Sequence, residues 1–435
     1  MTGSDGNEHE QEARVSGPMK PVDEQVAILM RGTRFADETE EWGRLETDGR
    51  GLRAQMQAEL TEKLKLGRPL RVYLGVDPTG TELHVGHFVP LQKLRKFQDL
   101  GHQVIFLIGD YTAQIGDPSG QAGERRRFQH EEVLALARTY ADQAFRILDR
   151  ERTEVRYNGE WLAKLTFADL IELASIFPMK QIIARRDFQQ RMERGESLRF
   201  HEALYALMQG YDAYALKCDV QVGSYDQHFN MLAGRAIQEH FGDKPHAMIT
   251  NPIIIGTDGR KMSKSYGNTI NINDEPFDMY GKTMRIADEH LPEYLELTSS
   301  LEPAELDALQ AQVRSGGNPM DVKKRLAFNL VEQYHGKPAA EEAAEKFRQV
   351  VQEKEAPDAV PEVRVPSALL SASWVDLLAA LSLTKSKGEA RRLIQQGGFY
   401  VEQEPVSDGD APASVPSEGV LIRLGKRRYH RLVRG

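Results

Sequence analysis

The sequence predicts an α/β fold: a doubly wound, Rossmann-like parallel-sheet domain, then a small α-helical domain and a C-terminal α+β module. Two observations support this prediction. Segments rich in β-branched and aromatic residues alternate with amphipathic helical segments between residues 69 and 255. From 276 to 352 the pattern is helical with little strand-like sequence, and three prolines then indicate a linker at 353–366.

The first strand–helix–strand unit is predicted from "PLRVYLGV" (69–76), which is rich in β-branched and aromatic residues, and from the more continuously apolar 102–110. The segment between them carries an apolar stripe at helical spacing. Pro90 is tolerated only in the first turn, so this helix is expected to begin at about residues 86–88. The stripe consists of Phe88, Leu91, Leu94 and Phe97.

The later elements follow the same alternation. Residues 131–150 predict an amphipathic helix, and 160–217 are predicted to be mostly helical. Residues 219–227 begin as a strand and end in a polar turn, and 246–255 predict another strand. Residues 367–435 have a separate pattern and predict a compact tail.

The composition excludes several classes of protein. The chain has 435 residues, 40% of them hydrophobic and 28% charged, which is an ordinary globular balance. No apolar run approaches the roughly 20 residues of a membrane helix, and the polar start is not a secretory signal. Residues 1–24 are therefore expected to be a disordered extension.

The cysteine content and the net charge add two further limits. Cys218 is the only cysteine, which excludes internal disulfides and cysteine-rich metal sites and favours a reducing, cytoplasmic location. The formal net charge of -9 argues against a protein covered in basic surface, but a local basic patch can still bind RNA.

The segment "DPTGTELHVGH" (77–87) is the first candidate for chemistry. His84 and His87 are three residues apart at a predicted helix N-terminus, where unpaired N–H groups and a partial positive charge favour an anion. Gly86 allows a flat ring or a phosphate to approach the backbone. Two surface histidines are the plain alternative, and a zinc site lacks further ligands at fitting spacing. The position in the first βα turn, where doubly wound folds bind nucleotides, favours a phosphate site.

The segment "DGRKMSKSYGN" (258–268) is the second candidate. Lys261 and Lys264 lie in a small, polar, glycine-flanked stretch, which alone is typical of a solvated loop. It lacks the spacing of a P-loop. It does follow a strand that should end on the same side of the sheet as the His84 turn, so the two segments are expected to meet.

Together these two segments resemble the paired signatures of class I aminoacyl-tRNA synthetases, and the stretch from Lys261 to Ser265 matches the second signature literally. Further segments resemble the bacterial-type tyrosyl-tRNA synthetases, in that family's order, from about residue 25 to the end. They are "YLGVDPTG" (73–80), "IGDPSG" (115–120), "LYALMQGYD" (204–212) and the Asp-Gln pair at 226–227.

The resemblance implies roles for individual residues. Tyr73 and Asp212 would hold the substrate phenol, and Asp117, Tyr205 and Gln209 would hold its ammonium group, with Gln221 and Gln227 completing the tyrosine site. Independently of the family, positions 205, 209 and 212 fall on one helix face. Catalytic roles would fall to His84, His87, Lys261, Lys264, Thr79 and Arg125, and ATP would contact Gly75, Asp77, Gly86, Asp226, Met262, Ser263 and Ser265.

Two departures from the family pattern stand out. Ser224 and Tyr225 precede Asp226 where the family has a glycine and then a small Ser or Thr, so either the loop moves away from the substrate or the pocket is reshaped. In the charged loop at 116–129, Gln121 replaces a family lysine, and Arg126 or Arg127 is a candidate to supply the missing charge.

The tail resembles the S-four-like RNA-binding module. Its candidate RNA-binding residues are Lys385, Lys387, Arg391 and Arg392. Residues 366–435 contain ten Lys and Arg against seven Asp and Glu, which suits contact with a phosphate backbone. A solvated helix is the plain alternative.

The domain boundaries expected from this resemblance are as follows: a catalytic domain over 25–257 with a helical dimerisation insertion at 130–185, the lysine loop at 258–272, a helical anticodon-side domain at 273–352, and the RNA-binding domain at 367–435. The predicted function is tyrosine–tRNA ligase, with ATP and its Mg²⁺, tRNA(Tyr) as a partner, a homodimer, and no tightly bound metal. The alternatives are tryptophan–tRNA ligase and a small-molecule nucleotidyltransferase.

Overall fold

The computed structural model describes residues 19–35, 51–78, 83–117, 130–263, 266–352, 360–402, 404–425 and 428–435. The chain divides into two compact units, Met1–Ala343 and Ala344–Gly435, which are described separately. Among the described residues, no helix combines the length and apolar character needed to cross a membrane.

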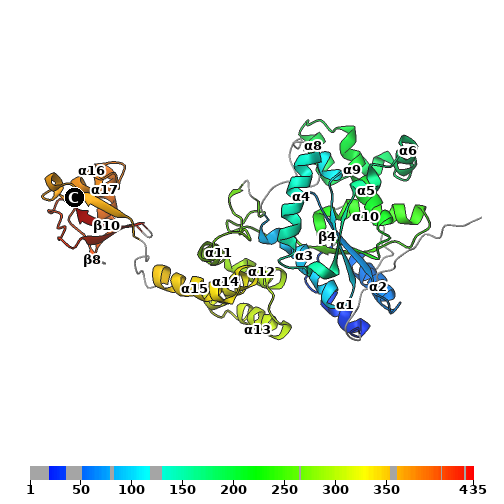
Figure 1. Ribbon diagram of the computed structural model, residues 1–435, viewed down its shortest axis with the longest axis horizontal. Coiled ribbons are helices and arrows are strands. Elements are labelled where there is room, and N and C mark those ends of the chain that lie inside the picture. The colour runs from blue at the N-terminus through cyan, green and yellow to red at the C-terminus, as the bar shows by residue number, and fades with distance from the viewer. Residues whose placement is uncertain are drawn as a thin grey trace, which may run out of the picture. The chain divides into compact units, whose positions relative to one another are not determined.

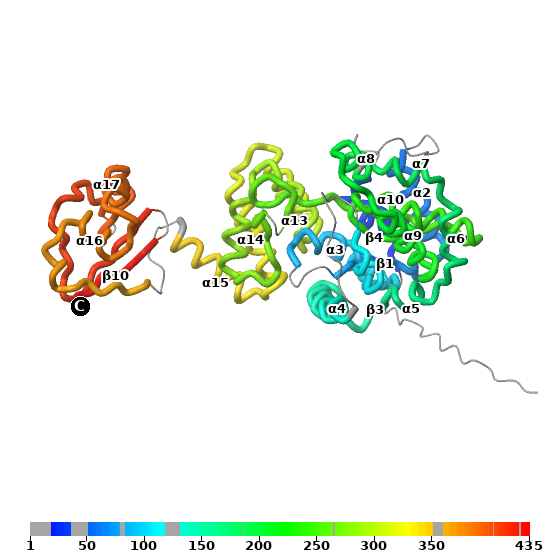
Figure 2. The backbone as a smooth tube through the Cα atoms, turned by 90° about the horizontal axis from the view of Figure 1, so that it is seen from above, coloured from blue at the N-terminus to red at the C-terminus, as the bar shows by residue number. Residues whose placement is uncertain are grey.

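The first unit is built on a five-stranded parallel sheet with the strand order β3-β2-β1-β4-β5. Helix α3 lies on one face of this sheet, and α9 and α10 lie side by side on the other (Figures 1 and 2). This arrangement confirms the doubly wound prediction. The strands are β1 (Arg71–Val76), β2 (Gln103–Ile108), β3 (Thr153–Tyr157), β4 (Val220–Ser224) and β5 (Ala247–Asn251).

The sheet opens between β1 and β4. Strand β1 pairs with β2 over all six of its residues, from Arg71 to Val76. It pairs with β4 over only two, Val72 with Val220 and Tyr73 with Gln221. The two neighbouring strands therefore separate toward their carboxyl ends, at the point where the strand order reverses and ligands bind in folds of this type.

The helices of the first unit fall into those around the sheet and those after it. The first group consists of α1 (Val22–Met30), α2 (Leu52–Leu64), α3 (Val85–Asp99), α4 (His130–Ala144), α5 (Gly159–Leu162), α6 (Phe167–Ser175), α7 (Met179–Ile183), α8 (Arg186–Glu193), α9 (Phe200–Ala215) and α10 (His228–His240). The second group consists of α11 (Pro276–Thr283), α12 (Leu291–Thr298), α13 (Pro303–Arg314), α14 (Pro319–His335) and α15 (Lys337–Phe347), the last of which crosses into the second unit.

Two details of this unit correct the sequence prediction. The sequence assigns no strand at 153–157, where the structure has β3 at the edge of the sheet. The expected disordered extension over 1–24 overlaps helix α1, which begins at Val22. This helix is ordered because it buries Val26, Leu29 and Met30. Residues 1–18 lie outside the described residues.

The helices after the sheet belong to the same compact unit as the sheet, so the boundary expected at 257–273 does not separate compact units. Arg31, just after α1, pairs with Glu296 of α12 at 2.8 Å and with Asp307 of α13 at 2.7 Å. Helix α12 also packs on α3. Lys93 of α3 donates to the carbonyls of Leu29 (2.9 Å) and Arg31 (2.6 Å), which fixes the end of α1 between the two parts.

The second unit has its own sheet and core. Its strand order is β6-β10-β9-β7-β8, with β6 parallel to β10 and the other pairs antiparallel. Its elements are β6 (Glu362–Val365), α16 (Trp374–Ala380), α17 (Lys387–Gln395), β7 (Phe399–Val401), β8 (Glu404–Pro405), β9 (Val420–Leu424) and β10 (Arg428–Arg434). Strand β6 overlaps the linker expected at 353–366, so the end of that segment belongs to the second unit instead. Its Val365 packs into the buried core that also contains residues of α16 and α17.

A buried histidine makes the first unit sensitive to acid. His102 is 3% exposed, and burial lowers its pKa to about 4. Its Nδ1 accepts from the N–H of Leu70 at 3.2 Å, and its Nε2 lies 3.0 Å from Oε1 of Gln25. The ring is therefore neutral, with its proton on Nε2.

We expect the free energy of unfolding to fall as the pH drops below about 6.5, because the unfolded chain then binds a proton that the folded chain excludes. Between pH 7 and pH 5 the loss from His102 is about 2 kcal/mol. Urea unfolding at both pH values measures it. The variant His102→Gln should lose less stability over this interval than the wild type, and an equal loss would contradict the assignment.

Candidate active site

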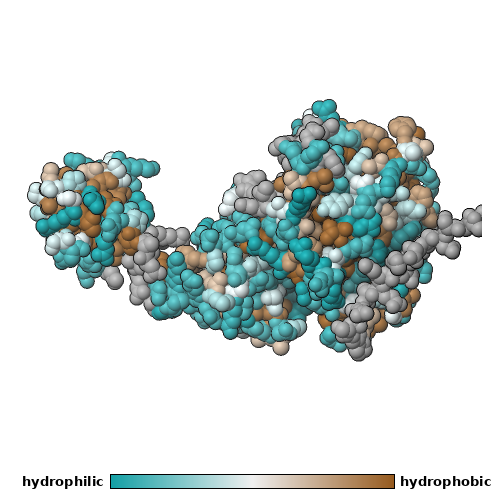
Figure 3. Space-filling model, in the orientation of Figure 1, coloured by the Kyte–Doolittle hydropathy of each residue, from teal (hydrophilic) through white to brown (hydrophobic). Residues whose placement is uncertain are grey.

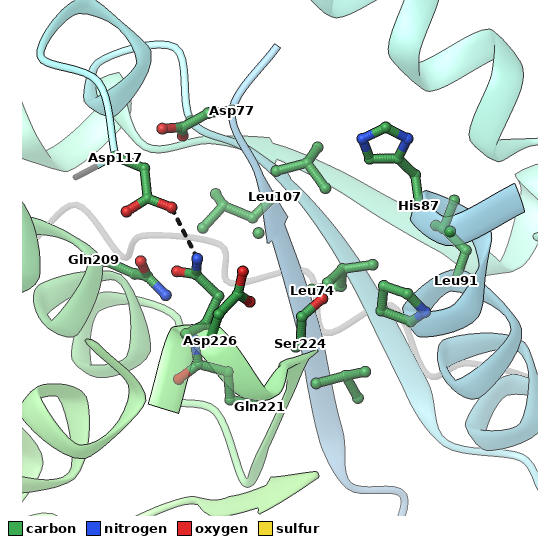
Figure 4. A pocket seen from close by; sticks show the side chains of 18 of the residues that line it. Leu74, Asp77, His87, Leu91, Leu107, Asp117, Gln209, Gln221, Ser224 and Asp226 are labelled. Atoms are coloured by element: carbon green, nitrogen blue, oxygen red, sulfur yellow. Dashed lines mark hydrogen bonds between the residues drawn. The ribbon is translucent and has the colours of Figure 1, made fainter. Parts of the chain in front are cut away.

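A cavity of about 330 Å³ opens where β1 and β4 separate. It brings together most of the residues predicted from the sequence, which Figure 4 shows in part. Those lining it are Tyr73, Gly75, Asp77, His84, Gly86, His87, Asp117, Tyr205, Gln209, Asp212, Gln221, Asp226, Gln227, Lys261 and Met262. Ser263 follows Met262 but does not line the cavity. Thr79, Arg125, Lys264 and Ser265, together with Gln121, Arg126 and Arg127, lie outside the described residues.

The deep end of the cavity contains two buried polar groups. Tyr73 of β1 is fully buried, and among the described residues its hydroxyl has no hydrogen-bond partner. Asp212 of α9 is 3% exposed, and burial raises the pKa of its carboxyl well above the usual value. Burial likewise raises the pKa of Tyr73. A buried polar group without a partner is costly, so this end is suited to a ligand group that both donates and accepts.

Neighbouring side chains hold the carboxylate of Asp212 in place. Trp161 Nε1 donates to its Oδ1 at 2.8 Å, and Asn158 Nδ2 donates to its Oδ2 at 3.3 Å. Asn158 also donates to Thr112 Oγ1 at 3.0 Å, while its own Oδ1 accepts from the N–H of Tyr111 at 3.0 Å. These hydrogen bonds therefore fix the orientation of the Asp212 carboxylate before a ligand binds.

A second set of polar side chains lines the part of the cavity next to α9, which is called the polar side below. Tyr205 donates its hydroxyl to Asp77 Oδ2 at 2.8 Å, and Thr112 donates to Asp77 Oδ1 at 2.7 Å. Gln227 Nε2 donates to Asp117 Oδ2 at 2.8 Å, the dashed line in Figure 4. Two carboxylates and several amide and hydroxyl oxygens gather here, which suits a cationic ligand group.

The two signature segments meet at the other end of the cavity. The segment at 83–85 bonds with that at 270–272: Val85 N–H donates to Ile270 O at 2.9 Å, and Ile272 N–H donates to Leu83 O at 3.1 Å. At the start of α3, the N–H of His84 donates to Nδ1 of His87 at 3.2 Å. Because this nitrogen accepts, the neutral His87 ring carries its proton on Nε2.

The close packing around this turn explains its glycine. A Cβ atom at residue 86 would lie 3.0 Å from the ring of His84 and 3.7 Å from Met262 Sδ. With glycine, the backbone at the helix start stays open to a flat ring or phosphate beside Met262.

Neighbouring side chains hold Lys261 and Ser263 of the lysine loop in place. Lys261 Nζ lies 3.7 Å from Asp226 Oδ2, and burial raises the pKa of that carboxyl. The N–H of Ser263 donates to Oδ1 of the buried Asn268 at 2.8 Å, and Asn268 Nδ2 donates to Lys261 O at 3.0 Å. Lys261 is thus held at the cavity mouth with its side chain half exposed.

The structure resolves the question raised by Tyr225. Its neighbours Ser224 and Asp226 line the cavity, but Tyr225 does not. Its ring lies instead against Arg34, whose guanidinium carbon is 5.6 Å from the ring centre. The bulky residue therefore turns away from the cavity, while Gln221, Asp226 and Gln227 keep their places in the lining.

The four basic residues predicted for RNA contact are exposed in the second unit. Lys387 pairs with Asp376 at 2.8 Å, and Arg391 pairs with Asp410 at 2.9 Å. Within the described part of the chain, Lys385 and Arg392 have no ion pair. These exposed ion pairs contribute little to stability.

Sequence reasoning missed Asn158, Trp161, Thr112 and Asn230, all of which fix the orientation of lining residues. A signal existed for the first of these, Asn158. Asn158 directly follows β3, so it lies at the carboxyl edge of the sheet, where sites of this fold gather. Because no strand was predicted at 153–157, that position was not recognised.

Comparison with known proteins agrees with this geometry. Residues 65–352 match the family described as tRNA synthetases class I (W and Y). Two relatives, both called tyrosine–tRNA ligase, are from Carboxydothermus hydrogenoformans (46% identical over 87% of this chain and 94% of the relative) and Thermotoga maritima (45%, 87% and 94%). The chain therefore belongs to the class I tRNA synthetases of the tryptophan and tyrosine family, and its relatives place it in the tyrosine branch.

Solved structures show the same fold. A truncated mitochondrial tyrosyl-tRNA synthetase from Aspergillus nidulans has a TM-score of 0.57 at 23% identity, covering 76% of this chain and 99% of that one. The tyrosyl-tRNA synthetase of Archaeoglobus fulgidus, solved with L-tyrosine, has a TM-score of 0.56 at 21% identity, covering 74% and 100%.

Any side chain at Gly109 is expected to clash with residues on the polar side of the cavity. A Cβ atom there would lie 2.0 Å from Asp77 Oδ1 and 2.3 Å from Thr112 Oγ1. We expect Gly109→Ala to lower the free energy of unfolding by about 1–3 kcal/mol, because the clash forces backbone or side-chain shifts.

Gly75→Ala is the matched control for urea unfolding. Its Cβ would meet Leu107 at 3.6 Å and Tyr73 at 3.8 Å, which are ordinary contacts. Its stability should stay within about 0.5 kcal/mol of the wild type. Equal losses in the two variants would show that the packing argument is wrong.

Proposed function

We propose that the protein is a tyrosine–tRNA ligase. It joins the carboxylate of L-tyrosine to the α-phosphate of ATP, which releases pyrophosphate. It then transfers the tyrosyl group from this adenylate to a hydroxyl of the terminal ribose of tRNA(Tyr), which releases AMP. The family membership and the tyrosine–tRNA ligase relatives support this activity. The observation that carries it in the structure is the buried pair formed by the Tyr73 hydroxyl and the Asp212 carboxylate.

This pair selects a phenol on physical grounds. A phenol hydroxyl donates one hydrogen bond, for which Asp212 is the acceptor, and accepts another, for which the Tyr73 hydroxyl is the donor. An indole N–H donates but does not accept, so tryptophan would leave the Tyr73 hydroxyl without a partner. An unpaired buried donor costs about 1–3 kcal/mol, which favours tyrosine over tryptophan. Gln221, also buried with an unpartnered Oε1 among the described residues, is proposed to border the same pocket.

The ammonium group of the substrate tyrosine is proposed to lie on the polar side of the cavity. Its ammonium group donates three hydrogen bonds and accepts none, which matches the oxygens of Asp117, Tyr205 and Gln209. Gln227 holds Asp117 in position. The tyrosine carboxylate then points toward the helix start at His84, where ATP is proposed to bind.

Catalysis is proposed to come from positioning and charge stabilisation. The carboxylate oxygen attacks the α-phosphorus while the bond to pyrophosphate breaks, so negative charge shifts onto phosphate oxygens. His84 and His87 stand at a helix N-terminus that favours those charges, and the Nε2–H of His87 is the ring donor. Lys261 is proposed to neutralise the leaving pyrophosphate, together with Thr79, Arg125 and Lys264.

ATP binding is proposed to use the remaining lining residues, with Mg²⁺ accompanying the nucleotide as part of the substrate. Gly75 and Gly86 leave room for close approach of the ribose and base, and Met262 offers a flat apolar contact. Asp77 and Asp226 supply acceptors for ribose hydroxyls or the base. Ser263 and Ser265 complete the lysine loop in this proposal.

The tail is proposed to bind the tRNA through Lys385, Lys387, Arg391 and Arg392. Their exposure and the excess of basic residues in the tail support a phosphate contact. A function in translation, with a single buried cysteine, supports a cytoplasmic location.

The chain is also proposed to form a homodimer. Large apolar side chains are exposed on α6, α7 and α9 of the first unit, and Figure 3 shows apolar surface over α6. Exposed apolar clusters of this kind mark protein contacts. They are Phe167 (78% exposed) and Ile171 (57%) on α6, Met179 (57%) and Ile183 (40%) on α7, and Phe200 (69%) at the start of α9.

The activity is tested by ATP–pyrophosphate exchange with each amino acid in turn. We expect exchange with tyrosine only, and Lys261→Ala to lower its rate by about tenfold or more while the Kd of tyrosine stays within about twofold. Lys65→Ala, at an exposed lysine that directly follows α2 and does not line the cavity, is the control and should exchange normally. Absence of exchange with tyrosine would refute the proposal, and exchange with tryptophan would select the alternative ligase.

The dimer is tested by sedimentation equilibrium. We expect the wild type to sediment at twice its chain mass of 49.0 kDa and Phe167→Asp to shift toward the monomer, because a buried carboxylate is costly at an apolar contact. Met320→Asp, at a 42% exposed residue of α14, is the control and should remain dimeric. A monomeric wild type would refute the dimer.

A further inference from the structure

A chain of side-chain hydrogen bonds runs from the start of α8 to the polar side of the cavity. Arg185, at the N-cap of α8, donates through Nη1 to Asn230 Oδ1 at 3.2 Å. Asn230 of α10 donates through Nδ2 to Gln209 Oε1 and to Gln227 Oε1, each at 3.0 Å. Gln227 Nε2 then donates to Asp117 Oδ2 at 2.8 Å (Figure 4).

The two ends of this chain determine the direction of every amide between them. A guanidinium only donates hydrogen bonds, so Asn230 turns its oxygen to Arg185 and its amino group to the two glutamines. Both glutamine oxygens must therefore face Asn230. At the other end a carboxylate only accepts, so Gln227 turns its amino group to Asp117. The two constraints agree, and no amide can rotate alone without placing two donors or two acceptors together.

The first donor in the chain is rigid. Arg185 is 5% exposed and Asn230 is 1% exposed. The guanidinium of Arg185 also donates to Asp187 from Nε at 3.2 Å and from Nη2 at 3.0 Å. It lies 4.8 Å from the ring centre of Phe188 and 4.9 Å from that of Phe229, where cation–π attraction holds its plane.

We propose that Arg185 and Asn230 are positioning residues for the ammonium group of the amino acid substrate. They set the orientation of the Gln209 and Gln227 amides: both glutamine oxygens face Asn230, and the Gln227 amino group therefore holds Asp117, the carboxylate proposed to accept from the cation. The proposal rests on the proposed function, because it assigns the polar side of the cavity to the ammonium group of tyrosine. Neither residue touches the substrate in this proposal.

The sharpest test is Asn230→Asp, which keeps the shape of the side chain. Its first oxygen still accepts from Arg185, but its second oxygen faces two glutamine oxygens. The glutamine amides then reverse, and Gln227 presents an oxygen to Asp117. We expect the Kd of L-tyrosine to rise by about tenfold or more, the effect of losing one or two hydrogen bonds to a charged group.

The readout that separates positioning from general damage is a ligand without the ammonium group. The analogue 3-(4-hydroxyphenyl)propionate keeps the phenol and the carboxylate. Its Kd, measured by displacement of labelled tyrosine or by direct calorimetry, should change by less than about threefold in the same variant. The ratio of the two affinities is thus the quantity that the proposal predicts.

Variants of the arginine give an independent test. Arg185→Met removes the donor that orients Asn230 and should cause the same selective loss, while Arg185→Lys keeps a donor and should lose less. Arg191→Met is the matched control: Arg191 lies on the same helix, is 3% exposed and pairs with Glu202, but is not bonded to Asn230. It should lower stability without changing the affinity ratio.

The outcomes are distinct. A selective loss of L-tyrosine affinity in Asn230→Asp and Arg185→Met supports the proposal. Equal losses for both ligands, or no loss in either variant, overturn it while the proposed function stands. A wild-type protein that binds neither ligand overturns the proposed function and the positioning role with it.

Discussion

The separation of β1 from β4 is the feature on which the rest of the site depends. Two neighbouring parallel strands would normally pair along their whole length, but here they do so only at Val72 and Tyr73. Beyond that point each strand still has its other neighbour, β2 or β5, and is held straight by it. The gap therefore has rigid walls, and side chains from both strands line it without needing a mobile loop.

The polar groups in this gap carry a cost that the surrounding structure offsets. The buried Asp212 carboxylate and Tyr73 hydroxyl are unfavourable in an apolar setting. Trp161 and Asn158 reduce the cost for Asp212 by donating to both of its oxygens. The hydroxyl of Tyr73 gains no such help among the described residues, so its stabilisation awaits the ligand. These polar groups thus lower the free energy of unfolding but prepare the cavity for a ligand, a compromise that is common in enzymes.

The sequence predicted the sheet and the helical part because their signals are local. Strands β1, β2, β4 and β5 are mostly buried and mostly apolar, and the apolar stripe of α3 has clear helical spacing. Strand β3 was missed because all five of its residues are partly exposed and charged side chains alternate within it, whereas β5, at the other edge of the sheet, is buried. An edge strand of this kind lacks the continuous apolar pattern that identifies its neighbours.

The residues that line the cavity were largely predicted from the sequence, but those that support them were not. Direct lining residues such as Asp212 and Gln209 followed from motif position and from one helical face. The supporting residues did not, because Trp161, Asn230 and Arg185 are recognisable only by their partners across the fold. The outward turn of Tyr225 depends on Arg34, nearly two hundred positions earlier, and no local pattern reports such a contact.

The bonds between residues 83–85 and 270–272 also have a consequence for how the molecule is made. Val85 and Ile270 are about 185 residues apart along the chain, and closing such a long loop is entropically slow. During synthesis the His84 turn leaves the ribosome long before its partner segment exists. The His84 end of the cavity therefore cannot be completed until residue 270 has been made, and a nascent chain stopped before that residue lacks part of the cavity wall.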